Sequence, residues 1–119
     1  MASFRGRCLC GAVRFEVDGP LDDVLLCHCG ECRRWAGHVW ASASAKRADL
    51  SVTGDALRWI DSPESETNAR RAFCTECGSS LFWEAPGRDT IAISAGALEA
   101  PTGLKIEGDV YREYAGDYY

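Results

Sequence analysis

The sequence has no long run of hydrophobic residues, and this absence argues against a membrane-spanning helix. Its apolar stretches are only a handful of residues long, whereas a membrane helix needs about 20. The first residues, MASFRGRCLCG, contain no apolar segment followed by the small residues of a signal-peptide cleavage site. We therefore expect a protein with no membrane partner and no secretion signal, located in the cytoplasm.

Positive charge is also in short supply. The 119 residues include 13 Lys and Arg against 18 Asp and Glu, which gives a net charge of −5. Proteins that bind nucleic acid usually present a basic face. The only arginine clusters here are Arg33–Arg34 and Arg70–Arg71, and each adjoins a cysteine motif. The charge balance argues against a nucleic-acid partner but is compatible with a small basic pocket.

The chain also lacks an apolar repeat of 3.6 residues that is long enough to predict a major helix. At most one helical turn is expected after Cys29 to Cys32. Alternating or short apolar patterns predict strands instead, at residues 12–17, 38–45, 56–60, 80–84 and 90–95. No repeat or linker divides the sequence, so residues 1–119 are predicted to form a single, mainly β domain of short antiparallel strands.

Cysteine, in contrast, is abundant. The seven cysteines lie in three tight clusters: Cys8 and Cys10, then Cys27, Cys29 and Cys32, then Cys74 and Cys77. In a reducing compartment, clustered cysteines are more often metal ligands or catalytic thiols than disulfides. Zinc prefers four ligands, so seven thiols raise the question of a missing eighth ligand.

The motif Cys74-x-x-Cys77-Gly78 is the strongest single indication of a metal site. Two intervening residues allow both sulfurs to reach one tetrahedral zinc at Zn–S distances of about 2.3 Å. The glycine suits a tight turn because it adopts positive φ without strain. Cys8-x-Cys10-Gly11 offers a second pair at closer spacing.

Two partitions of the sulfurs are compatible with this spacing. In the first, the Cys29–Cys32 pair joins the Cys74–Cys77 pair as a zinc ribbon, and the other three cysteines lie elsewhere. In the second, the first and last pairs form one four-cysteine site and the central triplet forms another. Spacing alone does not choose between them.

The second partition would produce two unequal sites. Four protein ligands saturate zinc and make a structural site, whereas three leave a position for water or substrate, as in catalytic zinc. His38, six residues after Cys32, could close that position and make the site structural. His28 lies between two cysteines and is expected to point away from their metal, so it would support a ligand or face solvent.

Four motifs follow one another along the chain: C-x-C-G-x-V-x-F at 8–15, C-H-C-x-x-C-R-R-x-x-G at 27–37, R-x-F-C-x-x-C-G-S-x-L at 71–81 and G-x-L-E at 96–99. Together they resemble the glutathione-dependent formaldehyde-activating enzymes and the related centromere protein V domain. The resemblance implies a zinc-stabilised β-tent fold with two zinc ions. It implies a structural zinc on Cys8, Cys10, Cys74 and Cys77, and a catalytic zinc on Cys27, Cys29 and Cys32.

This resemblance favours a zinc-dependent carbon–sulfur lyase. A thiol bound to zinc loses its proton and becomes a nucleophile, ready to add to a small aldehyde such as formaldehyde. A zinc that already has three thiolate ligands is a weak Lewis acid and suits a sulfur substrate, which agrees with glutathione as the co-substrate. The alternative hypothesis is a non-catalytic module in which both metals only stabilise a protein-binding surface.

The two arginines after the triplet are candidate glutathione ligands, because an arginine fork matches a carboxylate and glutathione carries two. Arg33 and Arg34 are therefore predicted to bind the co-substrate. The sequence does not single out a proton donor, although Glu99 and Lys105 are candidates.

Overall fold

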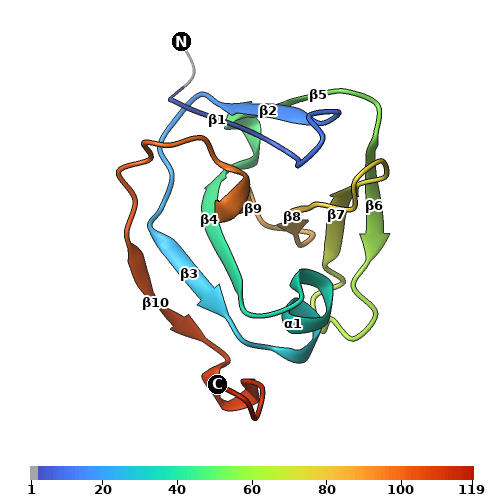
Figure 1. Cartoon of the computed structure of the whole chain (residues 1–119), viewed down its shortest axis with the longest axis vertical. Helices are drawn as coiled ribbons and strands as arrows, with labels where there is room; N and C mark the ends of the chain where they lie inside the picture. Colours follow the sequence, from blue (N-terminus) through green and yellow to red (C-terminus); the bar gives the residue numbers. More distant parts are fainter. Residues whose placement is uncertain (1–2) are drawn as a thin grey trace.

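Ten short strands and one α-helix form most of the regular structure in residues 3–119, which are the residues described by this computed structural model (Figure 1). Strand accounts for 42% of the residues and helix for 14%. The prediction of a mainly β, β-tent domain built from short antiparallel strands is confirmed.

The strands form two sheets. The smaller sheet has the order β1 (Phe4–Arg7), β2 (Arg14–Val17) and β5 (Leu50–Thr53). The larger has the order β10 (Ile106–Val110), β3 (Val24–Cys27), β4 (Trp40–Lys46), β9 (Thr90–Ser94), β8 (Ser80–Glu84), β7 (Arg70–Cys74) and β6 (Leu57–Asp61). Neighbouring strands are antiparallel, except that β10 and β3 run parallel. In Figure 1 the larger sheet extends from β10 on the left to β6 on the right.

The core lies where the two sheets face one another. In β2 the alternation seen in the sequence buries Phe15 and Val17 and leaves Arg14 and Glu16 exposed. The Phe15 ring meets Phe82 of β8 edge to face, with ring centroids 5.2 Å apart. Cys8 and Cys74 belong to the same buried cluster. The hydrophobic core therefore reaches two of the cysteine motifs and fixes their positions relative to one another.

Helix α1 (Gly30–Ala36) is short and is capped at both ends. Cys29 is its N-cap, and the sulfur accepts a hydrogen bond from the amide of Cys32. Gly37 ends the helix in the left-handed conformation, with φ of 88°. Three short 3₁₀ segments, η1 (Arg47–Asp49), η2 (Ala95–Ala97) and η3 (Arg112–Tyr114), complete the elements. Within residues 3–119, no helix combines the length and apolar character needed for a membrane crossing.

Candidate metal centres and the adjoining cavity

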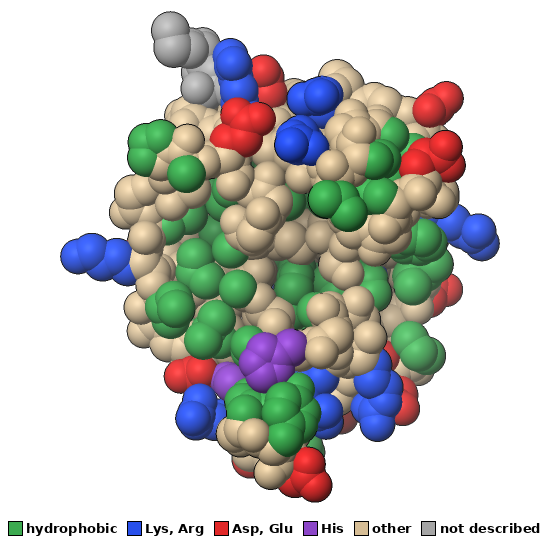
Figure 2. Space-filling view, viewed as in Figure 1, with side chains coloured by type: hydrophobic (Ala, Val, Ile, Leu, Met, Phe, Trp, Pro, Cys, Tyr) green, Lys and Arg blue, Asp and Glu red, His purple; other side chains and the backbone are tan. Residues whose placement is uncertain are grey.

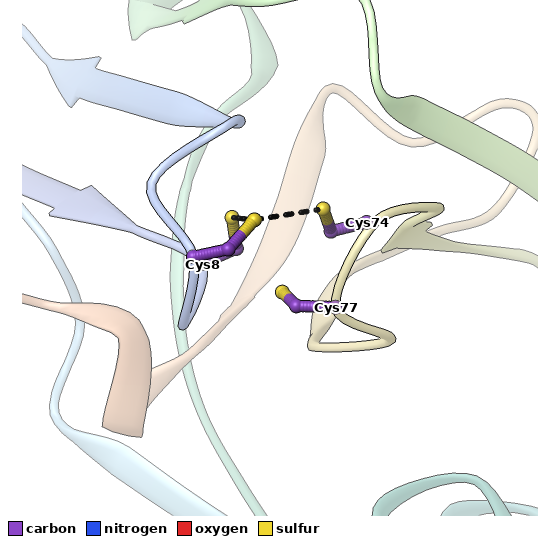
Figure 3. Close-up of side chains that lie close together, drawn as sticks. Cys8, Cys74 and Cys77 are labelled. Carbon is purple, nitrogen blue, oxygen red and sulfur yellow. Dashed lines mark hydrogen bonds between the residues drawn. The ribbon is translucent and has the colours of Figure 1, made fainter.

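Four cysteines from two turns bring their sulfur atoms together (Figure 3). Cys8 and Cys10 come from the turn between β1 and β2, Cys74 ends β7, and Cys77 lies in the following turn. The four sulfurs all lie within 4.8 Å of one another. The Cys8–Cys10 and Cys10–Cys74 sulfur distances are 3.7 and 3.8 Å. Tetrahedral zinc with Zn–S bonds of about 2.3 Å requires sulfurs about 3.8 Å apart, so this group fits the ion.

Backbone geometry in both turns supports thiolate sulfur. The amide of Val13 lies 3.3 Å from the Cys8 sulfur, and that of Ala12 lies 3.5 Å from the Cys10 sulfur. Each cysteine pair is followed by a glycine with positive φ, 83° at Gly11 and 78° at Gly78. The positive φ expected at the second turn is confirmed. These turns direct N–H groups toward the sulfurs, which favours anionic sulfur, although desolvation and the neighbouring thiols raise the pKa of Cys10 to about 11.

Cys77 shows the same preference for the anionic form. The Ser79 hydroxyl, 3.1 Å from the Cys77 sulfur, lowers the pKa of this thiol to about 5 by hydrogen bonding, and backbone N–H groups act in the same direction. The Ser79 oxygen in turn accepts a hydrogen bond from the amide of Leu9 in the opposite turn. A metal-binding cysteine must be deprotonated, so this arrangement prepares Cys77 as a ligand.

A second group contains the three remaining cysteines. Cys27 ends β3, Cys29 caps α1 and Cys32 lies within the helix, and their sulfurs are also within 4.8 Å of one another. Cys29 and Cys32 are grouped with Cys27 and not with the Cys74–Cys77 pair, so the zinc-ribbon partition is not the arrangement adopted. Each of the two groups could hold a metal ion.

Among residues 3–119, no histidine joins either sulfur group. His38 lies outside the three-sulfur group and directs Nδ1 to the hydroxyl of Tyr118 at 2.8 Å. His28 is buried, with Nδ1 3.0 Å from the Tyr119 hydroxyl and Nε2 2.7 Å from a carboxylate oxygen of Asp109. Its role is therefore to hold the loop between Cys27 and Cys29, and solvent exposure is excluded.

Arg71 contacts the three-sulfur group directly, a contact that the sequence did not reveal. The side chain is buried, and Nη1 and Nη2 each donate to the Cys32 sulfur at 3.6 Å. Nε donates to the Ser62 hydroxyl at 2.9 Å, and the guanidinium lies 5.0 Å from the ring centroid of Trp35. The only indication in the sequence was the position of this arginine three residues before Cys74.

Without a metal, the pKa values of Cys27 and Cys32 shift in opposite directions. Hydrogen bonding with the neighbouring Cys32 thiol lowers the pKa of Cys27 despite partial burial. The same bond and burial raise the pKa of Cys32, while the charge and hydrogen bonds of Arg71 act in the opposite direction. Cys27 is thus the thiol of this pair that ionises first.

The two arginines predicted to bind glutathione have different hydrogen-bond partners. Nε of Arg33 donates to the backbone carbonyls of His28 and Tyr114, at 3.3 and 3.1 Å. Arg34 is exposed, and its Nη1 donates to the Gly30 carbonyl at 3.3 Å. Neither lines the large cavity that borders the end of α1, so their binding role remains a prediction.

A cavity of about 800 Å³ is lined by Cys8 and Cys77 of the four-sulfur group and by Trp35 and Ala36 at the end of α1, whereas none of the three cysteines of the triplet lines it. It is bounded by the β1–β2 turn, the end of α1, the β7–β8 turn and η2. Figure 2 shows hydrophobic side chains across the hollowed middle of this face. Its lining includes Arg7, Leu9, Trp35, Trp40, Cys77 and Glu99. A volume of this size is typical of small-molecule sites.

Hydrogen bonds tie this cavity wall to the helix that carries Cys32. Trp40 Nε1 donates to the Ser94 hydroxyl at 2.8 Å, and that hydroxyl donates to the Ser80 carbonyl at 2.7 Å. The Ser80 hydroxyl then donates to the Trp35 carbonyl at 3.1 Å. Trp35 lies one helical turn after Cys32, so this chain of bonds fixes the cavity relative to the three-sulfur group.

Comparison with known proteins agrees with this geometry. The sequence model of the glutathione-dependent formaldehyde-activating enzyme family matches residues 3–114. The chain belongs to this family. An uncharacterized lyase of Schizosaccharomyces pombe is 23% identical over 121 residues, covering 100% of this chain and 85% of that protein. The crystal structure of a Rhodobacter sphaeroides protein is 28% identical with a TM-score of 0.69, covering 89% of this chain and 99% of that one.

Membership of the formaldehyde-activating enzyme family and the lyase-named relative support a glutathione-related, lyase-type function. The family resemblance noted in the sequence is confirmed. The matched region includes all seven cysteines and the segment from Gly96 to Glu99 beside the cavity.

Proposed function

We propose that this protein is a zinc-dependent carbon–sulfur lyase that joins a thiol, with glutathione as the co-substrate, to a small aldehyde such as formaldehyde, or cleaves the adduct. The observation that supports this most is the unequal size of the two sulfur groups, four sulfurs in one and three in the other. We propose a structural zinc in the first group and a catalytic zinc in the second, within a single domain spanning residues 1–119.

The positions of the two groups suit these different roles. Cys8 and Cys74 are buried in the core between the sheets, where a bound ion would hold two distant turns together. The triplet lies at the junction of β3 and α1, beside the helix that borders the cavity. A structural metal contributes directly to folding free energy, whereas a site with three protein ligands leaves room for a substrate.

The chemistry requires a sulfur–carbon bond to form while the carbonyl π bond breaks and its oxygen takes up a proton. A zinc ion bound to the triplet would supply the charge that keeps the substrate thiol ionised. The residues of the chain position the reactants: Trp35 and Trp40 provide apolar wall, and Arg7 lies where it could pair with a glutathione carboxylate. The candidate proton donors are Glu99, Lys105 and water, and of the two side chains only Glu99 lines this cavity.

The proposal is tested by following the exchange of ¹³C-formaldehyde with its glutathione adduct by NMR, while counting metal ions per chain. The wild-type protein is expected to accelerate exchange and to hold two zinc ions. Cys32→Ala is expected to keep its fold and one zinc ion but to lose the acceleration, because only the triplet is incomplete. A wild-type protein with two firmly held ions and no response to glutathione would favour the protein-binding module instead.

A further inference from the structure

Arg71 is a buried cation that has no carboxylate partner. Its exposed fraction is 4%, and within residues 3–119 none of the ion pairs involves it. Glu31, Asp61 and Glu64 line the same small cavity without pairing with it. Burial of an unpaired charge is costly, so the guanidinium requires an anionic partner among the groups it does touch.

Among residues 3–119, the one group in contact with Arg71 that can become anionic is the sulfur of Cys32, which is a thiolate when it binds a metal. Both terminal nitrogens of Arg71 donate to it at 3.6 Å, and the other contacts are the neutral Ser62 hydroxyl and the face of Trp35. Ser62 is buried as well and fixes the direction of the fork through Nε. The positive charge of the guanidinium therefore lies next to one particular ligand of the three-sulfur group, Cys32.

The charge of Arg71 changes the net charge around the metal site to which a fourth ligand would bind. Three thiolates and a divalent cation have one net negative charge, and an incoming thiolate would add a second. The fixed positive charge of Arg71 offsets one of them, and a guanidinium hydrogen-bonded to sulfur keeps its full charge because arginine does not deprotonate in proteins. A neutral ligand needs no such compensation.

We propose that Arg71 is a positioning residue that selects the charge of the fourth ligand, so that the three-sulfur group accepts an anionic thiolate in preference to a neutral donor. The inference rests on the proposed function, because it assumes that a metal in this group has an open position. It adds a determinant of ligand class that is not itself one of the cysteine ligands.

The test uses the cobalt-substituted full chain and follows its absorption bands during two titrations, one with 2-mercaptoethanol and one with imidazole. Arg71→Gln removes the positive charge. Arg71→Lys keeps the charge but lacks the two terminal nitrogens that donate together to Cys32. Arg70→Gln is the matched control, because Arg70 is the adjacent residue but is exposed and paired with Glu84. The absorption from the four-sulfur group, which takes no added ligand, serves as an internal reference.

We expect Arg71→Gln to bind 2-mercaptoethanol about 10- to 100-fold more weakly, the range typical when a partner of a metal ligand is removed. Imidazole affinity should stay within about 2-fold of wild type, and Arg71→Lys should recover part of the thiol affinity. Equal losses for both ligands, or no loss for either, would overturn the proposal.

Two further results keep the test decisive. If Arg71→Gln does not fold, Ser62→Ala takes its place, since it leaves the guanidinium but removes the hydroxyl that directs it. Ser62→Ala should lose less thiol affinity than Arg71→Gln and should keep its imidazole affinity. Equal losses of affinity for the two ligands would contradict the inference. If the absorption bands of the wild-type cobalt protein do not change with thiol, the proposed function itself fails. If the wild-type bands change and those of Arg71→Gln change equally, only the inference about Arg71 fails.

Discussion

The imidazole of His28 is hydrogen-bonded to the carboxylate of Asp109, with 2.7 Å between Nε2 and Oδ1. The His28 side chain is 3% exposed and that of Asp109 is 35% exposed, so the pair extends from the protein interior to its surface. It connects β10 to the loop between Cys27 and Cys29. A contact between residues 81 positions apart thus orients two ligands of the three-sulfur group.

Disruption of this pair should weaken metal binding in only one of the two groups. We expect Asp109→Asn to lower the metal affinity of the triplet by about 10-fold, as is typical for residues that orient metal ligands. The four-sulfur group should be unaffected. Competition with a chelator measures both affinities, and Glu107→Gln, an exposed substitution on the same strand, is the control. Equal weakening of both groups would indicate a general loss of stability.

The cysteine pKa directions predict unequal reactivity once a mild chelator has removed only the metal of the triplet. The pKa of Cys27 is lowered from 9.0, so more of it is thiolate at pH 7.5 than in an ordinary cysteine. The pKa of Cys32 is raised, so its thiolate is scarce at that pH. Alkylation followed by peptide mass spectrometry should therefore label Cys27 first, with a midpoint below pH 9. Equal labelling rates would contradict the hydrogen bond between these thiols.

Arg7 should affect the choice of thiol substrate. It lines the cavity, and its Nη1 donates to the carbonyls of Cys8 and Leu9 at 3.1 and 2.9 Å, which holds the guanidinium at the rim. We expect Arg7→Ala to raise KM for glutathione about 10-fold and to leave KM for 2-mercaptoethanol unchanged, because only glutathione has carboxylates to pair. Steady-state kinetics with both thiols provide the measurement. Arg5→Ala, on the same strand but paired with Glu16, should match wild type.

Phe82 is the side chain whose loss should cost the fold most. It is fully buried and contacts the ring of Phe15 in the opposite sheet. Phe82→Ala should lower the free energy of unfolding by about 3–5 kcal/mol, the usual cost of removing a buried aromatic ring. Ile106→Ala, at a position that is 65% exposed, should change it by less than about 0.5 kcal/mol. Denaturant titration of the metal-loaded proteins tests both, and similar values would place Phe82 outside the core.

Strands with internal alternation could be predicted from the sequence. The expected segments 12–17, 56–60 and 90–95 correspond to β2, β6 and β9, and 80–84 is β8. Segment 38–45 begins two residues early, because Gly37 ends α1 and the strand starts only at Trp40. Five strands were not predicted, namely β1, β3, β5, β7 and β10, and β10 has mostly exposed residues. Its parallel pairing with β3, a distant segment, holds it in place.

The candidate site was predictable only in part. The motifs indicated which cysteines could bind metal, but their spacing allowed two groupings. The β1–β2 and β7–β8 turns lie side by side and bring the first and last cysteine pairs together, which decides between the groupings. The contacts of Arg71 with Cys32 and of His28 with Asp109 join residues 39 and 81 positions apart. Such contacts depend on strand order, which local patterns do not contain.

The central claim is that the two sulfur groups differ in how completely they surround a metal, and X-ray absorption spectroscopy of the zinc-loaded protein tests it most directly. The account predicts a mean of fewer than four sulfur neighbours per zinc before glutathione is added, because one group has four sulfurs and the other three. The mean should rise to four when glutathione is present. A mean of four from the outset, or no change with glutathione, would contradict the account.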